Sequence, residues 1–127
     1  MRLIIVCDRL LAARRLCGEL SDCPAEIICV GDLKELKAAC NSLFDLALIN
    51  VAWAELVECV RTIRESPSGV NSAVLVDLER LPSEPSLAGV LPGLRAMACR
   101  HVDLVKLARR LTAGGREEDG RRKPILL

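Results

Sequence analysis

Aromatic side chains are scarce in this sequence of 127 residues, which holds one Trp, one Phe and no Tyr. Nucleic-acid bases commonly stack on aromatic side chains, so this chain offers almost no stacking surface. The formal net charge of +1 at pH 7 also gives no overall positive field that would attract nucleic acid or an anionic membrane. We therefore expect no nucleic-acid partner.

Long apolar runs are absent as well. The first ten residues, MRLIIVCDRL, contain an apolar run of only five residues before Asp8. Such a run is too short for a signal peptide or a membrane span. We expect a cytoplasmic protein that does not contact a membrane.

The sequence has one histidine, His101, and no C-x-x-C pair among its seven cysteines, so it offers no ligand spacing typical of a metal centre. The cysteines are Cys7, Cys17, Cys23, Cys29, Cys40, Cys59 and Cys99. Most lie inside apolar periodic segments, where a free thiol behaves as a small buried hydrophobe. We expect reduced core thiols and no metal. The best candidate for redox sensing is Cys23, next to Pro24 in a predicted loop.

Motifs of common enzymes are also missing. There is no glycine-rich phosphate loop, no Ser-His-Asp set and no carboxylate pair with room for a substrate. We expect neither enzymatic activity nor a cofactor.

What the sequence does contain is an alternation of two kinds of segment. The short apolar runs that predict strands are 3–6, 27–30, 46–49, 73–76 and a weaker one at 96–99. The segments with helical spacing are 10–20, 33–40, 53–63 and 102–111. This alternation predicts an α/β fold with a doubly wound, five-stranded parallel sheet in residues 1–112. The polar, Gly-rich residues 113–127 predict a disordered tail.

Folds of this kind bind ligands beyond the carboxyl ends of their strands. We therefore expect the polar residues at the strand ends to lie close together. The residues that end or follow the five strands are Cys7-Asp8, Gly31-Asp32, Asn50, Asp77 and Arg100-His101.

At these strand ends the chain resembles the receiver domains of bacterial response regulators, the CheY-like domains of two-component signalling. IIVCD resembles the family's first strand with its terminal acids, and FDLALIN resembles the strand that carries the phospho-acceptor aspartate. Residues 100–104, RHVDL, stand where Lys-Pro-Phe-Asp-Leu is usual. The resemblance covers residues 1–112 and implies a flavodoxin-like (βα)5 fold with strand order 2-1-3-4-5.

The phosphorylation chemistry that the resemblance implies needs groups that this chain lacks. In the family an ionised aspartate is the nucleophile, and acidic oxygens hold Mg²⁺. Asn50 stands at the acceptor position, and an amide is a very poor nucleophile. Cys7 replaces one metal-binding acid, which leaves Asp8 as the only match to the acidic pair.

Three further positions also depart from the family pattern. Asp77 stands in place of the family's Ser or Thr and brings negative charge where phosphate oxygens would lie. Arg100 replaces the phosphate-binding lysine, and His101 replaces the following proline. We consider two interpretations: either Arg100 pairs with Asp8 and Asp77 and fixes one conformation, or these groups are solvated strand ends.

The sequence thus predicts a stand-alone pseudo-receiver, a signalling module that binds a protein partner without being phosphorylated. The partner would be a kinase or effector of the pathway, or a second copy of the chain. The alternative is a ligand- or redox-responsive receiver that uses the strand-end pocket or a cysteine. The expected interaction face is apolar for a surface, and its residues are Leu87, Val90, Leu91, Met97 and Leu104.

Overall fold

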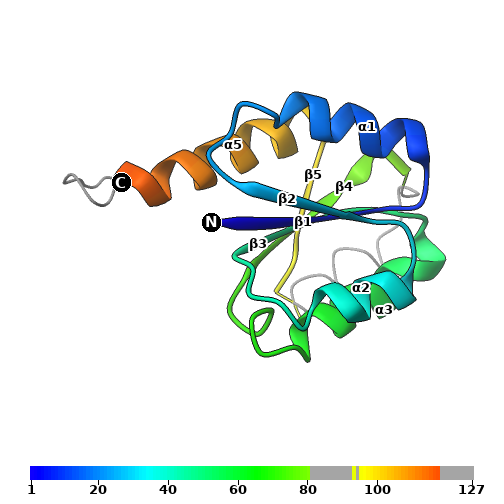
Figure 1. Ribbon diagram of the computed structural model, residues 1–127. Helices are drawn as coiled ribbons and strands as arrows, with labels where there is room; N and C mark the ends of the chain where they lie inside the picture. Colours follow the sequence, from blue (N-terminus) through cyan, green and yellow to red (C-terminus); the bar gives the residue numbers. More distant parts are fainter. Residues whose placement is uncertain (81–92, 94, 118–127) are drawn as a thin grey trace.

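The five predicted strands form a single parallel sheet in the order β2-β1-β3-β4-β5, which confirms the predicted fold class. The computed structural model describes residues 1–80, 93 and 95–117 (Figure 1). The strands are β1 (Arg2–Cys7), β2 (Glu26–Val30), β3 (Leu46–Asn50), β4 (Ala73–Asp77) and β5 (Met97–Cys99).

Helices cover both faces of the sheet. Figure 1 shows α1 and α5 on one face, and α2 and α3 on the other. The helix bounds are α1 (Leu10–Glu19), α2 (Leu33–Ala39), α3 (Trp53–Arg64) and α5 (His101–Glu117). This arrangement is the doubly wound, flavodoxin-like architecture, in which ligands bind at the carboxyl ends of the strands.

The apolar runs of the sequence are strands because both of their faces are buried. In β1, Leu3 and Ile5 belong to the core under α1 and α5, whereas Ile4 and Val6 belong to the core under α2 and α3. Each strand side chain points to the face opposite its neighbour's, so a run without polar residues fills both layers. The two cores hold the sheet in place and leave polar groups to its ends.

The start of α2 is capped by side chains of its own first turn and the residue before it. The carboxylate of Asp32 accepts a hydrogen bond from the backbone N–H of Glu35 at 2.8 Å, which satisfies one donor of the first turn. The Glu35 carboxylate in turn accepts from the N–H of Gly31 at 2.6 Å. These bonds fix the loop that links β2 to α2 at the carboxyl edge of the sheet.

The last helix is longer than the sequence predicts. Residues 113–117 are helical, so the prediction of a disordered tail from residue 113 is wrong for these five positions. Thr112, one residue past the last predicted apolar position, is buried, and its hydroxyl donates to the carbonyls of Ala108 and Arg109 within this longer helix. Residues 118–127 of the predicted tail lie outside the described residues.

Candidate functional site

Four of the predicted strand-end residues meet at the carboxyl edge of the sheet: Cys7, Asn50, Asp77 and His101. Asn50 on β3 lies beside Cys7 on β1 in the strand register, and the Cys7 thiol donates to Asn50 Oδ1 across 3.8 Å. Asn50 Nδ2 donates to Asp77 Oδ2 on β4 at 3.0 Å. Asn50 and Asp77 are each only 1% exposed. The amide therefore serves as a buried donor to a buried carboxylate.

His101, in the first turn of α5, lies between two carboxylates. Its Nδ1 is 2.7 Å from Asp77 Oδ2, and its Nε2 is 2.8 Å from Glu19 Oε1 at the end of α1. Burial lowers the His101 pKa, but the hydrogen bonds with Asp77 and Glu19 outweigh that effect and raise it above the ordinary value. Only the doubly protonated imidazolium donates from both ring nitrogens. The geometry therefore fits a charged His101 that bridges α1, β4 and α5.

Glu79 adds a third carboxylate to this edge. It lies in the 3-10 turn that follows β4 (Leu78–Arg80), and its backbone N–H donates to Asp77 Oδ1 at 2.9 Å. Its carboxylate accepts from Arg15 at 2.8 and 2.9 Å and from Asn50 Nδ2 at 3.2 Å. Burial raises the Glu79 pKa, but the hydrogen bonds from Arg15 and Asn50 lower it by more. Glu79 is thus held as an anion.

We call these six residues the strand-end network. They are Arg15, Glu19, Asn50, Asp77, Glu79 and His101. Three carboxylates are matched by one guanidinium and one imidazolium, with the Asn50 amide bridging two of the acids. Because the partners come from α1, β3, β4, the turn after β4 and α5, the network joins elements that are distant in the sequence.

Arg100 does not take part in this network, so the predicted ion pair of Arg100 with Asp8 and Asp77 is wrong. The Arg100 side chain is 79% exposed, and its Nε lies 3.2 Å from Asp103 Oδ2. Arg100 directly precedes α5, where its carbonyl accepts from Leu104 N–H, and its side chain pairs with Asp103 in the first turn of that helix. The neighbouring His101 reaches Asp77 instead. Asp8 is exposed at the end of β1.

Sequence reasoning missed three members of the network. Arg15 and Glu19 lie four residues apart on α1, a spacing that places both on one face of a helix. The same four-residue spacing could have indicated two charged groups aimed at one site, but it is equally typical of the solvated face of an amphipathic helix. Glu79 follows Asp77 by two positions, and no sequence pattern marks its turn.

Asp77, Glu79 and His101 are also the described residues that could hold a metal ion. One ligand atom from each lies within 4.8 Å of the others. The atoms in question are already satisfied, because His101 Nδ1 contacts Asp77 and Arg15 binds Glu79. A cation would have to displace Arg15 and a proton of His101. The arrangement favours the internal ion pairs over a metal.

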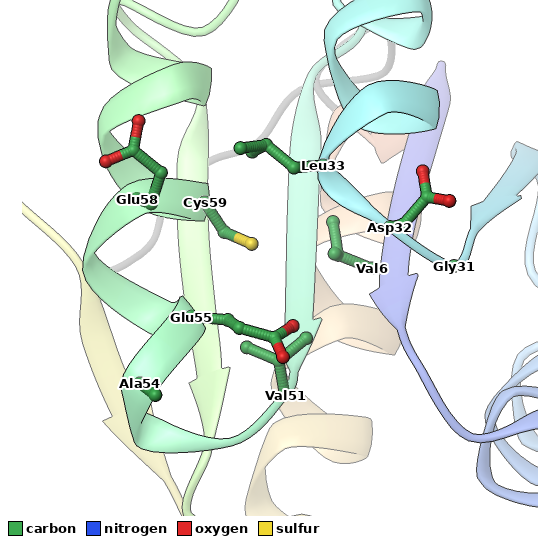
Figure 2. A pocket seen from close by; sticks show the side chains of 9 residues that line it. All are labelled: Val6, Gly31, Asp32, Leu33, Val51, Ala54, Glu55, Glu58 and Cys59. Carbon is green, nitrogen blue, oxygen red and sulfur yellow. The ribbon is translucent and has the colours of Figure 1, made fainter.

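A pocket of about 280 Å³ opens on the other face of the sheet, between α2 and α3 (Figure 2). Its floor is apolar, and the acidic residues Asp32, Glu55 and Glu58 are among those that line it; in Figure 2 the Glu55 carboxylate reaches from α3 toward the space between the helices. In Figure 2 the Cys59 sulfur points from α3 toward α2 across the pocket. Burial raises the pKa of this thiol to about 11, so it is protonated near neutral pH. The lining residues are Val6, Gly31, Asp32, Leu33, Val51, Ala54, Glu55, Glu58 and Cys59.

A second, wider hollow of about 710 Å³ lies beside the strand-end network. It is formed by the first turns of α1 together with Arg15 and Glu79. Leu10 and Leu11, which line it, are 66% and 78% exposed. Large apolar side chains at such exposure next to a charged network are typical of a contact surface.

The predicted interaction face is only partly exposed among the described residues. Met97 is 55% exposed, as expected for a contact residue, but Leu104 is fully buried in the core under α1 and α5, so its place on that face is wrong. Leu104 faces inward because it belongs to the apolar stripe of α5 that packs on the sheet. The remaining three residues, Leu87, Val90 and Leu91, lie outside the described residues.

Comparison with known proteins adds no assignment to this geometry. No family model matches the chain, and no curated protein is significantly similar to it. Within the described part of the chain, no helix has the length and apolar character needed to cross a membrane.

Proposed function

We propose that this chain is a pseudo-receiver, a signalling module that binds a protein partner and is not phosphorylated at its strand ends. The receiver resemblance of the sequence and the strand order 2-1-3-4-5 support the comparison with that family. On this proposal the chain acts in the cytoplasm of a bacterial cell, in a two-component pathway. On this proposal the chain acts by binding a partner through its surface, and it catalyses no reaction.

The observation that carries the proposal is the buried contact between Asn50 and Asp77. Phosphorylation of a receiver requires a carboxylate that attacks phosphorus and forms an acyl phosphate. Asn50 presents an amide whose Nδ2 donates to Asp77 at 3.0 Å and to Glu79 at 3.2 Å. The amide is a poor nucleophile, and it is already used to bridge two acids. A phosphoryl group would therefore meet no attacking oxygen.

Charge at the same place also opposes phosphate. By the resemblance, the Asp77 carboxylate stands where phosphoryl oxygens would be bound in the family, and the Glu79 carboxylate lies beside it on Asn50. Like charges at short distance repel strongly in a buried site. Two cations at this edge, His101 and Arg15, are engaged by these acids and by Glu19. The strand-end network thus holds α1, β4 and α5 together without a ligand.

Exposed apolar side chains on α1, β5 and α5 supply a surface for a partner. Leu10 and Leu11 protrude from α1, Met97 from β5, and Val102 from α5, where it is 59% exposed. On the proposal the partner is another signalling protein or a second copy of the chain. Sedimentation is expected to show a dimer at high micromolar concentration, or affinity capture a specific partner; a monomer without a captured partner would contradict this part of the proposal.

The chemical part of the proposal is tested by intact-mass spectrometry after incubation with a small phosphodonor and Mg²⁺. We expect no phosphoryl adduct on the wild type, with an active receiver domain as the positive control for the reagent. An Asn50→Asp variant restores a carboxylate at the acceptor position. We expect no adduct on this variant either, because Asp77 and Glu79 still surround position 50. An adduct on the wild type would overturn the proposal, and an adduct on the variant alone would refute the role of the surrounding charges.

A second candidate function is favoured by the pocket between α2 and α3. Its apolar floor and the Glu55 carboxylate that reaches into it suit a small amphipathic cation, which would make the module ligand-responsive. Binding of small apolar amines, measured by chemical-shift changes, is expected to disappear in a Cys59→Met variant that narrows the pocket. Amines that bind with equal affinity to both proteins, or to neither, would remove this candidate.

A further inference from the structure

Two cysteines outside the strand-end network lie in direct contact. Cys17 on α1 and Cys29 on the edge strand β2 have their sulfur atoms 2.7 Å apart. Theirs is the only such pair among the cysteines in the described part of the chain. Cys29 is exposed and Cys17 half-buried, whereas Cys7, Cys40, Cys59 and Cys99 are buried. Solvent and small oxidants therefore reach this pair and not the core thiols.

We propose that Cys17 and Cys29 form a redox-active dithiol that closes to an intramolecular disulfide under mild oxidation. A disulfide has an S–S distance of about 2.05 Å, so closure requires the sulfurs to approach by well under 1 Å. Rotation about the side-chain bonds suffices for a movement of this size, and neither α1 nor β2 has to be displaced. The inference is independent of the pseudo-receiver proposal.

The oxidant is of the peroxide class, and the reaction balances with hydrogen peroxide. One sulfur, as the thiolate, attacks a peroxide oxygen and becomes a sulfenic acid, and the departing hydroxide takes a proton to form water. The second sulfur attacks the sulfenic sulfur, and the S–OH oxygen leaves as a second water. The two thiols lose two electrons and two hydrogens in total, and a dithiol reductant reverses the change.

The pKa of the Cys29 thiol affects how readily this residue is oxidised. Although the residue as a whole is exposed, desolvation of the Cys29 sulfur beside Cys17, followed by the hydrogen bond with Cys17, raises the Cys29 pKa to about 12. The thiol is therefore protonated near neutral pH, and because the thiolate is the nucleophile, oxidation is expected to accelerate as the pH rises.

Closure would fix α1 to the edge of the sheet. Cys29 pairs with Ile5 of β1 in the register, and Cys17 lies midway between Arg15 and Glu19, the two α1 members of the strand-end network. The disulfide would therefore restrain the helix that supplies two of the charged groups at the carboxyl edge of the sheet. The disulfide would also close the chain segment between Cys17 and Cys29 into a loop, which restricts the unfolded chain. We therefore expect the midpoint of thermal unfolding to rise by about 5–10 °C.

The cysteine predicted from sequence as the redox candidate, Cys23, provides the matched control. It is half-buried and packs against the core under α1 and α5. Its position in a loop suggested exposure, but no other cysteine sulfur lies at contact distance from it. If any half-buried thiol in this segment were equally reactive, Cys23 would react as Cys17 and Cys29 do.

The test is oxidation of the full chain with hydrogen peroxide, followed by alkylation in acid and intact-mass measurement. A glutamate-specific protease then cuts after Glu19 and Glu26, which places Cys17, Cys23 and Cys29 in three different peptides. We expect a mass loss of two hydrogens, a cross-link between the Cys17 and Cys29 peptides, and its removal by dithiothreitol. A Cys23→Ser variant should behave as the wild type, while Cys17→Ser and Cys29→Ser should lose the cross-link.

The wild-type peptide map decides the question even if a serine variant fails to fold. Full alkylation of Cys17 and Cys29 after peroxide treatment would overturn the inference. So would a cross-link to Cys23, or oxidation to sulfinic acid without a disulfide. An unchanged midpoint of thermal unfolding in a cross-linked sample would contradict the proposed restraint of α1.

Discussion

The two sides of the sheet's carboxyl edge differ in how their space is filled. On the α1/α5 side, Asp77 is fully covered and contacts Asn50, Glu79 and His101. On the α2/α3 side, a pocket of about 280 Å³ remains open above an apolar floor. On the α1/α5 side the polar groups therefore form hydrogen bonds with one another. On the α2/α3 side a pocket can still bind a ligand.

The energetics of the two sides differ accordingly. Removing one partner from a buried ion pair leaves an uncompensated charge, which costs much more than the pair contributes. Adding apolar volume to an open pocket buries surface that water now contacts, which is mildly stabilising. Substitutions on the network side should thus be costly, and substitutions on the pocket side should be tolerated.

The largest effect is expected from His101→Gln. The variant removes the cation between Asp77 and Glu19, so the free energy of unfolding should fall by about 3 kcal/mol, measured by urea denaturation at pH 6. Because the His101 pKa is raised in the folded state, its contribution is complete below the ordinary value of about 6.5 and is lost as the pH rises through the raised value. The gap between wild type and variant should therefore narrow above pH 6.5. A gap that widens with pH would show that His101 is not stabilised as a cation.

Asn50→Asp should have the next largest effect. It places a third carboxylate beside Asp77 and Glu79 and removes the donor that bridges them, so we expect a loss of about 2 kcal/mol at pH 7. The neighbouring acids should raise the pKa of the new carboxyl group in the folded state, so the penalty should shrink toward pH 4. Urea denaturation of both proteins at the two pH values measures this, and an equal penalty at both would contradict the buried acidic setting of position 50.

Cys59→Met probes the open side. The longer side chain should extend into the pocket and increase the free energy of unfolding by about 0.5 kcal/mol. Thermal or urea denaturation measures the change, with Cys40→Met, a buried cysteine that does not line this pocket, as the matched control. We expect the control to be destabilised by overpacking. A loss of more than about 1 kcal/mol for Cys59→Met would mean that the pocket cannot accept the added atoms.

Arg100→Gln should have the smallest effect. The side chain is 79% exposed and paired only within its own helix turn, so the change in the free energy of unfolding should be within about 0.5 kcal/mol. A direct comparison with His101→Gln therefore distinguishes the roles of the two adjacent residues, Arg100 and His101. A fall in the free energy of unfolding as large as that of His101→Gln would contradict the exposed position of Arg100 and support its pairing with Asp8 and Asp77.

The sequence was sufficient to predict the sheet because its strand signals are physical and local. Runs such as residues 3–6 and 46–49 have no polar position, which requires burial on both faces and hence helices on both sides. The alternation of segments then allowed few topologies. The strand order 2-1-3-4-5, which the family resemblance implied, is confirmed. The contact of Asn50 with Asp77 followed from the same rule, because parallel strands end at one edge.

The rest of the network could not be predicted from strand ends alone. Whether Arg100 or His101 faces the site depends on where α5 begins, and a shift of one residue rotates a side chain by about 100° around the helix. Glu19 and Arg15 reach the site from α1, and Glu79 from a turn whose shape no motif in the sequence marks. Rotation at helix starts and the reach of long side chains are properties of the packed structure.

The most direct test of this account is the titration of His101 by NMR. The chain has a single histidine, so its imidazole signals need no assignment by mutagenesis. The account predicts a pKa above the ordinary value of about 6.5, and a fall toward that value when Glu19 is replaced by Gln. A pKa at or below 6.5 in the wild type would contradict the claim that a charged histidine holds the strand ends together.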